Sequence, residues 1–285
     1  MSPDTELRLR DHVARLADEH PPLRPDTVDY TVRDPQLLEE RYGHVLDYMA
    51  RVELEVDRNV LELMTMLPDP PDIDRHFYAD VWQPQEIQHG LILDRLQVEL
   101  GREPAVTDTT TVSAKLHILG ALSHVNGFQD VCRMIYYLTG MSTERSAVLA
   151  YNLLHDGVRD LGEMAIAESV IAPIRRQEPG HYAFYRMSAT AHWARLSGWQ
   201  RWLVRRMRTV SFGPVGVNNL EQHADFGDVM KALGITDQFE SFAEQGTRIE
   251  RDLLWAHRQG LKVPDYVLRA FHDAVSLAAE RHAAI

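Results

Sequence analysis

Two short stretches of the sequence place a histidine three residues after a glutamate: QEIQH, with Glu86 and His89, and QEPGH, with Glu178 and His181. Residues three apart lie on the same face of an α-helix, so each pair can present a carboxylate and an imidazole to one point. Apolar residues flank both pairs, and a buried carboxylate needs a compensating cation. The two pairs are therefore candidate metal-binding motifs, although a single pair of this kind has low specificity.

A dinuclear metal site in a helical bundle adds one lone glutamate from each of two further helices. Before the second pair, Glu144 interrupts an otherwise apolar helical stripe. The other members of that stripe are Tyr137, Met141, Val148 and Tyr151. Before the first pair, the candidate acids are Glu53, Glu55, Asp57 and Glu62. Helical periodicity slightly favours Glu53, but the residues alone leave this ligand open.

Pro179 and Gly180 lie between the two candidate ligands of the second pair. Proline and glycine are the weakest helix formers, and the missing N–H of Pro179 leaves a carbonyl near position 175 without its helical partner. Helix distortions of this kind are frequent at functional sites. We expect a helix here nevertheless, because metal ligation would hold Glu178 and His181 in place.

Helical periodicity dominates the chain, with no alternating strand pattern. The predicted helices cover residues 44–67, 75–100, 113–155 and 160–198, followed by two or three helices within about 220–285. We expect a break near the Asn-Gly at 126–127, a turn at HDGVRD (155–160) and a loop at SFGPVGVNN (211–219). The expected fold is all-α, with one domain over 1–285 and a metal-binding bundle over about 44–198.

Composition limits the class of protein. The chain has 285 residues, of which 45% are hydrophobic, enough to fill a core. Cys132 is the only cysteine, which excludes an internal disulfide and a cysteine-based zinc site. A net charge of −12 argues against binding to nucleic acid or to an anionic membrane. The charged N-terminus does not read as a signal peptide, so we expect a soluble cytosolic protein.

The motifs together resemble those of the soluble acyl-carrier-protein desaturases of plant plastids and mycobacteria, which are ferritin-like di-iron proteins. VWQPQEIQHGLILDRL is similar to the family's W-T-A-E-E-x-R-H-G segment, and STERSAVLAYNLL to its third ligand helix. The matched residues are Trp82, Glu86, His89, Gly90, Glu144 and Arg145. RRQEPGHYAFY stands where the family has D-E-x-x-H. The likeness covers about residues 45–185, and the family's spacing selects Glu55 over Glu53.

The sequence departs from the family beside the ligands. Gln85 and Gln177 replace the acid that usually precedes each ligand glutamate, and Ala147 replaces a common threonine. The family's arginine just before each histidine is Gln88 in the first pair and Gly180 in the second. Together with Trp82, the first three positions would surround the ligands, where neighbouring groups orient them and carry protons and electrons. Replacing an acid by an amide removes a charge and a proton-relay group.

The resemblance implies a ferritin-like four-helix bundle that holds two iron ions, with manganese in place of one iron left open. It implies the six ligands Glu55, Glu86, His89, Glu144, Glu178 and His181, with Glu86 and Glu178 chelating or bridging the metals. The implied reaction is O₂-dependent oxidation of a C–H bond, most simply desaturation of an acyl chain on acyl carrier protein. Hydroxylation or N-oxygenation would use the same ligands, and a metal-poor, non-catalytic binding protein is the alternative.

The resemblance also implies partners: acyl carrier protein, a ferredoxin-like electron donor and a second copy of the chain. An arginine cluster between the second pair and the 211–219 loop is the candidate docking surface for the acidic carrier protein. Its members are Arg195, Arg201, Arg205, Arg206 and Arg208.

Overall fold

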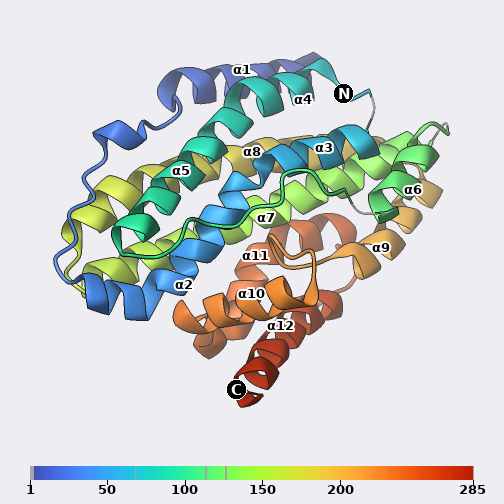
Figure 1. The fold of residues 1–285 in the computed structure, drawn as a ribbon. Helices are drawn as coiled ribbons and strands as arrows, with labels where there is room; N and C mark the ends of the chain where they lie inside the picture. Colours follow the sequence, from blue (N-terminus) through green and yellow to red (C-terminus); the bar gives the residue numbers. More distant parts are fainter. Residues whose placement is uncertain (1–2, 68, 113, 126, 285) are drawn as a thin grey trace.

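The computed structural model describes residues 3–67, 69–112, 114–125 and 127–284. These residues form helices and no strands, as predicted (Figure 1). The longest helices pack in two antiparallel pairs, α2 (Pro35–Leu54) against α5 (Gln83–Glu99) and α7 (Phe128–Asp160) against α8 (Ala172–Arg195). All four lie side by side in Figure 1, so residues far apart in the sequence can meet between them.

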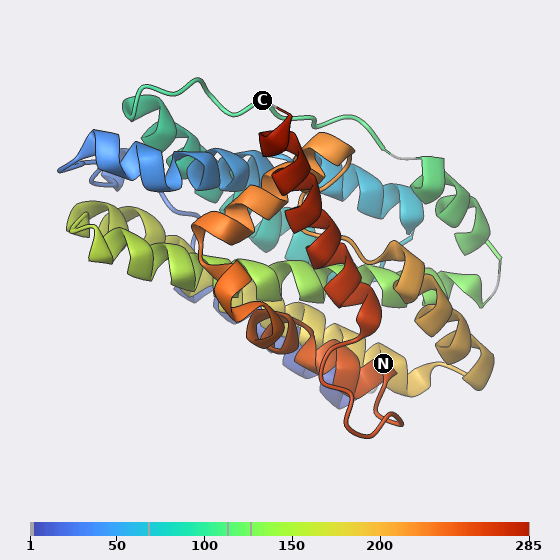
Figure 2. The same ribbon diagram turned by 90° about the horizontal axis from the view of Figure 1, so that it is seen from below.

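Shorter helices surround these four. Helix α1 (Pro3–Glu19) packs along α8, and α6 (Ala114–Ser123) packs on α7 and on α3 (Val56–Met66). A lower layer is attached to α2 and α7, and Figure 2 shows its last helix crossing beneath the bundle. This layer and its connections contain α9 (Gly198–Ser211), α10 (Leu220–Ala232), η4 (Ile235–Gln238), α11 (Phe239–Leu254) and α12 (Asp265–Ala283).

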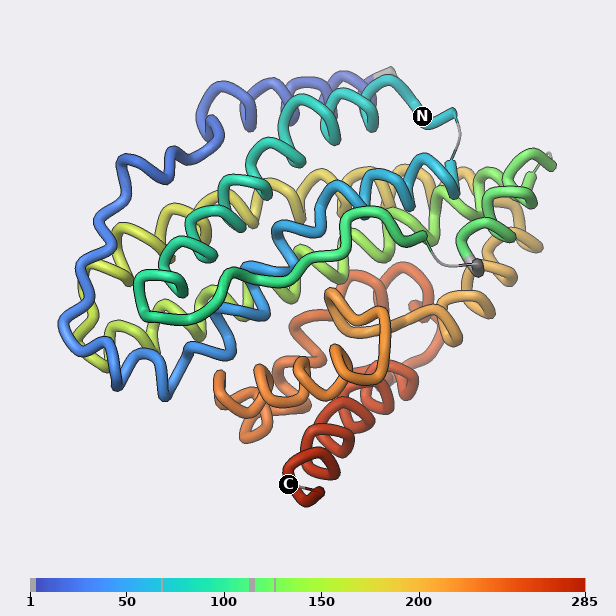
Figure 3. Tube along the Cα trace, viewed as in Figure 1, coloured from blue at the N-terminus to red at the C-terminus, as the bar shows by residue number. Residues whose placement is uncertain are grey.

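Two short helices and one extended segment connect the longer helices. The short helices are η1 (Pro25–Thr27), between α1 and α2, and α4 (Asp72–His76), between α3 and α5. The segment over 101–112 has no regular structure and crosses over α2 and α3 (Figure 3). Among the described residues, no helix has both the length and the apolar character needed to cross a membrane.

Both helices that carry a glutamate–histidine pair begin with a π-helical segment. These segments are η2 (Phe77–Trp82) before α5 and η3 (Ile166–Ile171) before α8. Each closes with an N–H bonded to a carbonyl five residues back, and each is followed by a proline, Pro84 or Pro173. Proline has no N–H, and its ring crowds the carbonyl four residues back, so an α-helical bond is already lost there. π-Helical turns are frequent at functional sites.

Of two interruptions predicted in the helical region 113–160, the structure contains one and not the other. The break near 126–127 is confirmed: α6 ends at Ser123, and Gly127 precedes α7 with φ of 91°. The turn at 155–160 is wrong, because α7 continues to Asp160. Gly157 misled the prediction. A Cβ at this position would lie 1.9 Å from the Tyr42 hydroxyl, so its glycine serves close packing and not a turn.

The C-terminal helices are held to the bundle by a buried ion pair. Arg208 on α9 donates from Nε to Glu250 Oε1 at 3.0 Å and from Nη2 to Glu250 Oε2 at 2.9 Å. The same guanidinium donates to Ser142 Oγ on α7 at 2.6 Å, and Tyr266 donates to Glu250. Both charged side chains are almost fully buried. This pairing joins α7, α9, α11 and α12 at one point.

The expected arginine docking cluster is therefore not one exposed surface. Arg208 is wrong as a docking residue, because its guanidinium is buried against Glu250. Arg201 and Arg205 are partly buried, and both donate to backbone carbonyls and lie over the Trp193 ring. Of the five, only Arg195 and Arg206 are exposed.

We expect Glu250→Ala to lower the free energy of unfolding by about 3 to 5 kcal/mol, because it leaves the Arg208 charge buried without a partner. Urea denaturation followed by circular dichroism measures this change. Arg206→Ala is the control on the same helix, and its effect stays within about 0.5 kcal/mol because the side chain is exposed. Equal effects of the two substitutions would contradict the structural role given to the pair.

Candidate metal centre

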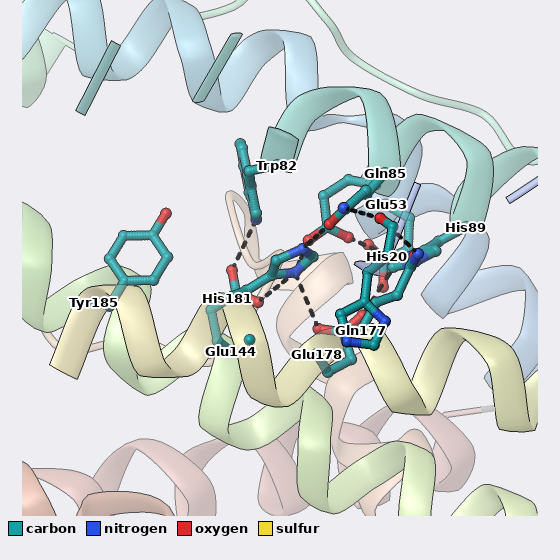
Figure 4. Close-up of polar contacts among 12 residues, drawn as sticks. His20, Glu53, Trp82, Gln85, His89, Glu144, Gln177, Glu178, His181 and Tyr185 are labelled. Carbon is teal, nitrogen blue, oxygen red and sulfur yellow. Dashed lines mark hydrogen bonds and ion pairs between the residues drawn. The ribbon is translucent and has the colours of Figure 1, made fainter. Parts of the chain in front are cut away.

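Carboxylates and imidazoles from four helices converge in the interior of the bundle (Figure 4). They form two overlapping groups, each with ligand atoms that all lie within 4.8 Å of one another. One group consists of Glu53, Glu86, His89 and Glu178, and the other of Glu86, Glu144, Glu178 and His181. Helix α2 supplies Glu53, α5 the first pair, α7 Glu144 and α8 the second pair. Glu86 and Glu178 belong to both groups.

The two shared glutamates divide their oxygens between the two histidines. Glu86 places Oε2 at 3.1 Å from His89 Nδ1 and Oε1 at 2.8 Å from His181 Nδ1. Glu178 places Oε1 at 3.2 Å from His89 Nδ1 and Oε2 at 3.8 Å from His181 Nδ1. Each carboxylate thus spans the two groups, which is the arrangement of a bridging ligand between two cations.

The two glutamines that distinguish this sequence from the resembled family hold the histidines. The carbonyl of Gln177 accepts from His89 Nε2 at 2.7 Å, and the carbonyl of Gln85 accepts from His181 Nε2. Each histidine is therefore bonded by the glutamine of the opposite helix. Because an amide oxygen only accepts, Nε2 carries the proton in both rings. Nδ1 faces the carboxylates, where it carries a second proton in the metal-free site, and a metal ion that displaces this proton would bind the Nδ1 lone pair.

The amide nitrogens of the same glutamines are anchored in turn by the N-terminal segment. Gln85 Nε2 donates to the carbonyl of His20, and Gln177 Nε2 donates to the carbonyl of Pro21 at 2.9 Å and to that of His20 at 3.2 Å. His20 and Pro21 follow the end of α1, which the sequence interpretation did not connect with the site. An acid could not make these bonds, since an ionised carboxylate has no hydrogen to donate.

Glu53, and not Glu55, is the α2 residue of the cluster, so the choice based on the family's spacing is wrong. Helix α2 ends at Leu54 and α3 starts at Val56, and Glu55 lies at the break with ψ of 7°. The Glu55 carboxylate is buried against Arg58 Nη2 at 2.6 Å and Arg51 Nη1 at 3.2 Å. It also accepts from the N–H of Asp108 in the extended segment. Glu55 therefore stabilises the helix break.

Each lone glutamate has an aromatic partner that orients it. Tyr151 donates its hydroxyl to Glu53 Oε1 at 2.7 Å, and Trp82 donates its indole N–H to Glu144 Oε1 at 3.2 Å. Trp82 thus lies beside the ligands, as expected, whereas the sequence pattern shows Tyr151 only as a member of the stripe around Glu144. Ala147 is partly buried against the core, and Arg145 points away to the carbonyl of Gln245.

Pro179 lies inside a helix that continues without a break to Arg195. Gly180 has a packing reason that the sequence did not show. A Cβ at this position would lie 2.3 Å from Leu16 Cδ2, so glycine lets α1 approach α8 closely. His12 Nε2, also on α1, lies 2.9 Å from the Gly180 carbonyl. The weak helix formers therefore mark the contact with α1, which also positions the segment that holds the glutamines.

Burial and crowding of like charges shift the pKa values of the cluster. Burial and the neighbouring Glu86 charge raise the pKa of Glu53 well above its usual range, and burial raises the pKa of Glu144 to about 8. Burial opposes protonation of His89, but the carboxylates of Glu178 and Glu86 prevail and raise its pKa to about 9. Without a cation, the site must therefore hold protons to offset its carboxylates.

The donor set fits two divalent cations. Four carboxylates and two neutral imidazoles balance the charge of two such ions, and oxygen and nitrogen donors without sulfur suit iron or manganese. Two buried atoms at the centre, Glu178 Oε1 and His181 Nδ1, lie within ion-pair distance of His89 Nδ1 and Glu86 Oε1 but make no hydrogen bond of good geometry with the described residues. A metal ion would satisfy both of them.

We expect substitutions of Glu53 and Glu55 to change different properties, the metal content in one case and the stability of the fold in the other. Glu53→Ala removes a candidate ligand and lowers the metal content while the fold is kept. Glu55→Ala leaves Arg51 and Arg58 buried without their carboxylate, so it lowers the free energy of unfolding by about 3 kcal/mol or more and keeps the ligand set intact. Elemental analysis and urea denaturation of both variants distinguish the two roles. If the Glu55 variant alone lost metal, Glu55 would be the ligand, as the family's spacing predicts.

The stability of the metal-free protein should fall as the pH rises from about 6.5 to 9. The raised pKa values of His89 and Glu144 mean that the folded state binds protons that the unfolded chain releases. Each such proton contributes a slope of up to about 1.4 kcal/mol per pH unit. The pKa of Glu86 is lowered, so its contribution to stability has the opposite pH dependence. That contribution is lost only as the pH falls below the usual pKa range of a glutamate.

Thermal denaturation of chelator-treated protein at a series of pH values measures this slope. The raised pKa values of Glu53 and His181 act in the same direction. Glu144→Gln removes one of these titrations, so its slope should be shallower. A metal-free protein whose stability rises over this range would contradict the assigned protons.

Comparisons with known proteins do not assign the chain to a family. No family model matches the sequence, and no solved structure matches it significantly. Solute carrier family 12 member 2 of Mus musculus and the protein of the same name from Homo sapiens are each 25% identical over 173 residues, which is 61% of this chain. The chain spans only 12% of the length of these proteins. The resemblance to the desaturases therefore depends on the motifs and on the site they form.

Proposed function

We propose that the chain is a non-haem dinuclear iron oxidase that uses O₂ to oxidise an organic substrate. The observation that carries the proposal is the division of the Glu86 and Glu178 oxygens between two histidine Nδ1 atoms. A mononuclear site would not need two carboxylates that each span both halves. A purely structural core would not need three buried carboxylates and a fourth, partly buried one at a single point.

The architecture supports the same proposal. Two helices each contribute a glutamate and the histidine three residues later, and two others each contribute one glutamate. This is the ligand pattern of ferritin-like di-iron bundles. We infer a ferritin-like bundle formed by α2, α5, α7 and α8, with the remaining helices as additions to it.

Two bound iron ions would supply electrons to O₂ and the oxidising power to attack an unactivated C–H bond. The chain supplies the geometry for this chemistry. Gln85 and Gln177 keep both imidazoles in one tautomer, and Trp82 and Tyr151 orient the lone carboxylates. The stacked rings of Phe77 and Phe184, with centroids 3.7 Å apart, lie beside His181 and exclude water from that side.

The resemblance to acyl-carrier-protein desaturases makes an acyl chain on acyl carrier protein the first substrate class to test. Arg195 and Arg206 are the members of the arginine cluster that remain exposed for an acidic carrier. We propose a ferredoxin-like donor as the source of electrons and a homodimer as the assembly, both from the same resemblance. Product analysis distinguishes desaturation from hydroxylation or N-oxygenation, since all three use these ligands.

We expect about two irons per chain after anaerobic reconstitution with ferrous ion, as elemental analysis would measure. His181→Ala should lose at least one of them. His192→Ala is the matched control on the same helix, because His192 bonds the carbonyl of Asp130 and lies outside the cluster. A folded wild-type protein that binds no iron would overturn the proposal. Iron content unchanged in the His181 variant would overturn the ligand assignment.

Oxygen consumption with a panel of acyl carrier proteins tests the substrate class in the iron-loaded protein. Consumption coupled to an alkene product supports a desaturase. Iron loading without substrate-dependent O₂ uptake would reject the acyl-carrier substrate and leave the centre itself in place.

A further inference from the structure

A line of redox-active side chains leads away from the Glu144 side of the candidate metal centre. It begins at Trp82, whose indole N–H donates to Glu144 Oε1 at 3.2 Å (Figure 4). The Trp82 ring meets the Tyr78 ring with centroids 5.2 Å apart, and Tyr78 lies 5.5 Å from Tyr136. Tyr136 and Tyr137 follow at 5.8 Å. The centroids of successive rings in this line are thus between 5.2 and 5.8 Å apart.

The line ends at a buried acid and a surface pocket. Tyr137 donates its hydroxyl to Asp74 Oδ2 at 2.6 Å, and the other oxygen of Asp74 is buried without a partner. Tyr137 also lines a pocket of about 210 Å³ between α1, α7 and α8. Three arginines and two acids line the same pocket: Arg10, Arg133, Arg195, Glu6 and Asp72. Both acids are paired, Glu6 with Arg10 at 2.8 Å and Asp72 with Arg75 at 3.2 Å, and Arg133 Nε is buried without a hydrogen-bond partner in the described part of the chain. The positive charge of Arg133 and Arg195 is therefore left for an anionic molecule.

Packing alone does not explain these residue types. Phenylalanine would fill the same space without burying a hydroxyl, which costs free energy unless it is bonded. Instead, the hydroxyl of Tyr78 meets that of Tyr185, that of Tyr137 meets a carboxylate, and that of Tyr136 is buried without a hydrogen-bond partner among the described residues. Burial raises the pKa values of Tyr136, Tyr137 and Tyr185 well above their usual range, so these phenols stay protonated. A phenol that loses an electron must therefore also pass on its proton, and Tyr137 has an acceptor in direct contact.

We propose that Trp82, Tyr78, Tyr136 and Tyr137 form a relay that carries one-electron oxidising equivalents from the metal centre to the arginine-lined pocket, with Asp74 as the proton acceptor of Tyr137. The relay builds on the proposed function, because the metal centre supplies the oxidising equivalent. Its use is protection: an oxidant formed without substrate is discharged at the surface and does not damage the ligands.

The steps balance. One electron passes from Tyr137 to the oxidised centre, which is reduced by one electron. The rings of Tyr136, Tyr78 and Trp82 transmit this electron and are not left oxidised, so the Tyr136 and Tyr78 hydroxyls keep their protons. The O–H bond of Tyr137 breaks and its proton moves to Asp74 Oδ2, which leaves a neutral tyrosyl radical and a carboxylic acid. An anionic one-electron donor in the pocket, of the ascorbate class, then reduces the radical. The proton returns from Asp74, which restores the phenol and the carboxylate.

The test uses iron-loaded protein exposed to O₂ with ascorbate and without organic substrate. Peptide mass spectrometry measures oxidation of Trp82, and freeze-quench electron paramagnetic resonance detects a tyrosyl radical. We expect Tyr137→Phe to raise Trp82 oxidation several-fold and to remove the radical that ascorbate quenches. Asp74→Asn should act in the same direction, because the ring is kept and the proton acceptor is lost.

Tyr48→Phe is the matched control, since it removes the hydroxyl of another buried tyrosine, which bonds the Val215 carbonyl away from the relay. Iron content is measured for every protein, so that a loss of metal is separated from a loss of the relay. Equal Trp82 oxidation in the wild type, the Tyr137 variant and the control, at equal iron content, would overturn the relay alone. A wild type that binds no iron would overturn the metal centre and the relay together.

Discussion

Four carboxylates meet in the interior of the bundle, and their mutual repulsion is the constraint on which the rest of the structure depends. Elsewhere this chain neutralises buried acids with arginine: Glu55 has Arg51 and Arg58, and Glu250 has Arg208. Within the described residues, none of the four cluster carboxylates pairs with an arginine or a lysine; their partners are imidazoles, a phenol and an indole. A charge left unpaired in the interior costs far more than one exposed to water. The contrast is what the proposed function requires, since bound cations would supply the compensating charge that arginine supplies elsewhere.

The glutamines beside the ligands change how the site is supported. In the resembled family these positions are acidic, and a carboxylate there can accept from histidine and relay protons. Gln85 and Gln177 also accept from histidine, but their amide N–H groups donate as well, Gln85 to the carbonyl of His20 and Gln177 to the carbonyls of His20 and Pro21. The histidines are thereby tied to the N-terminal segment by bonds that an ionised acid could not make. The two glutamines therefore hold the histidines with neutral side chains. They leave the imidazoles less electron-rich than a carboxylate in the same place would.

The sequence predicted five of the six cluster residues, because Glu86, His89, Glu144, Glu178 and His181 lie in local helical patterns. The sixth, Glu53, was favoured by periodicity, but the family's spacing pointed to Glu55. That spacing failed because a helix break at Glu55 turns its side chain toward two arginines, and no local pattern shows such a break. Long-range contacts were hidden in the same way. Gly180 leaves room for the side chain of Leu16 on α1, and the partner of Arg208 lies 42 residues further along the chain.

The two halves of the centre are not equivalent, and this asymmetry follows from the residues around them. Glu53 is only partly buried and is held by the phenol of Tyr151 beside the helix break. Glu144 is fully enclosed and is held by Trp82 at the end of a π-helical segment. A π-helical turn shifts the following side chains around the helix axis, so η2 sets the direction in which Trp82 and Tyr78 point. The π-helical segment that precedes α5 therefore also places the oxidisable indole of Trp82 against the candidate ligand Glu144. The proposed relay would therefore exchange electrons with the surface through the Glu144 half, because Trp82 contacts Glu144, whereas Glu53 has the phenol of Tyr151, which is outside the relay.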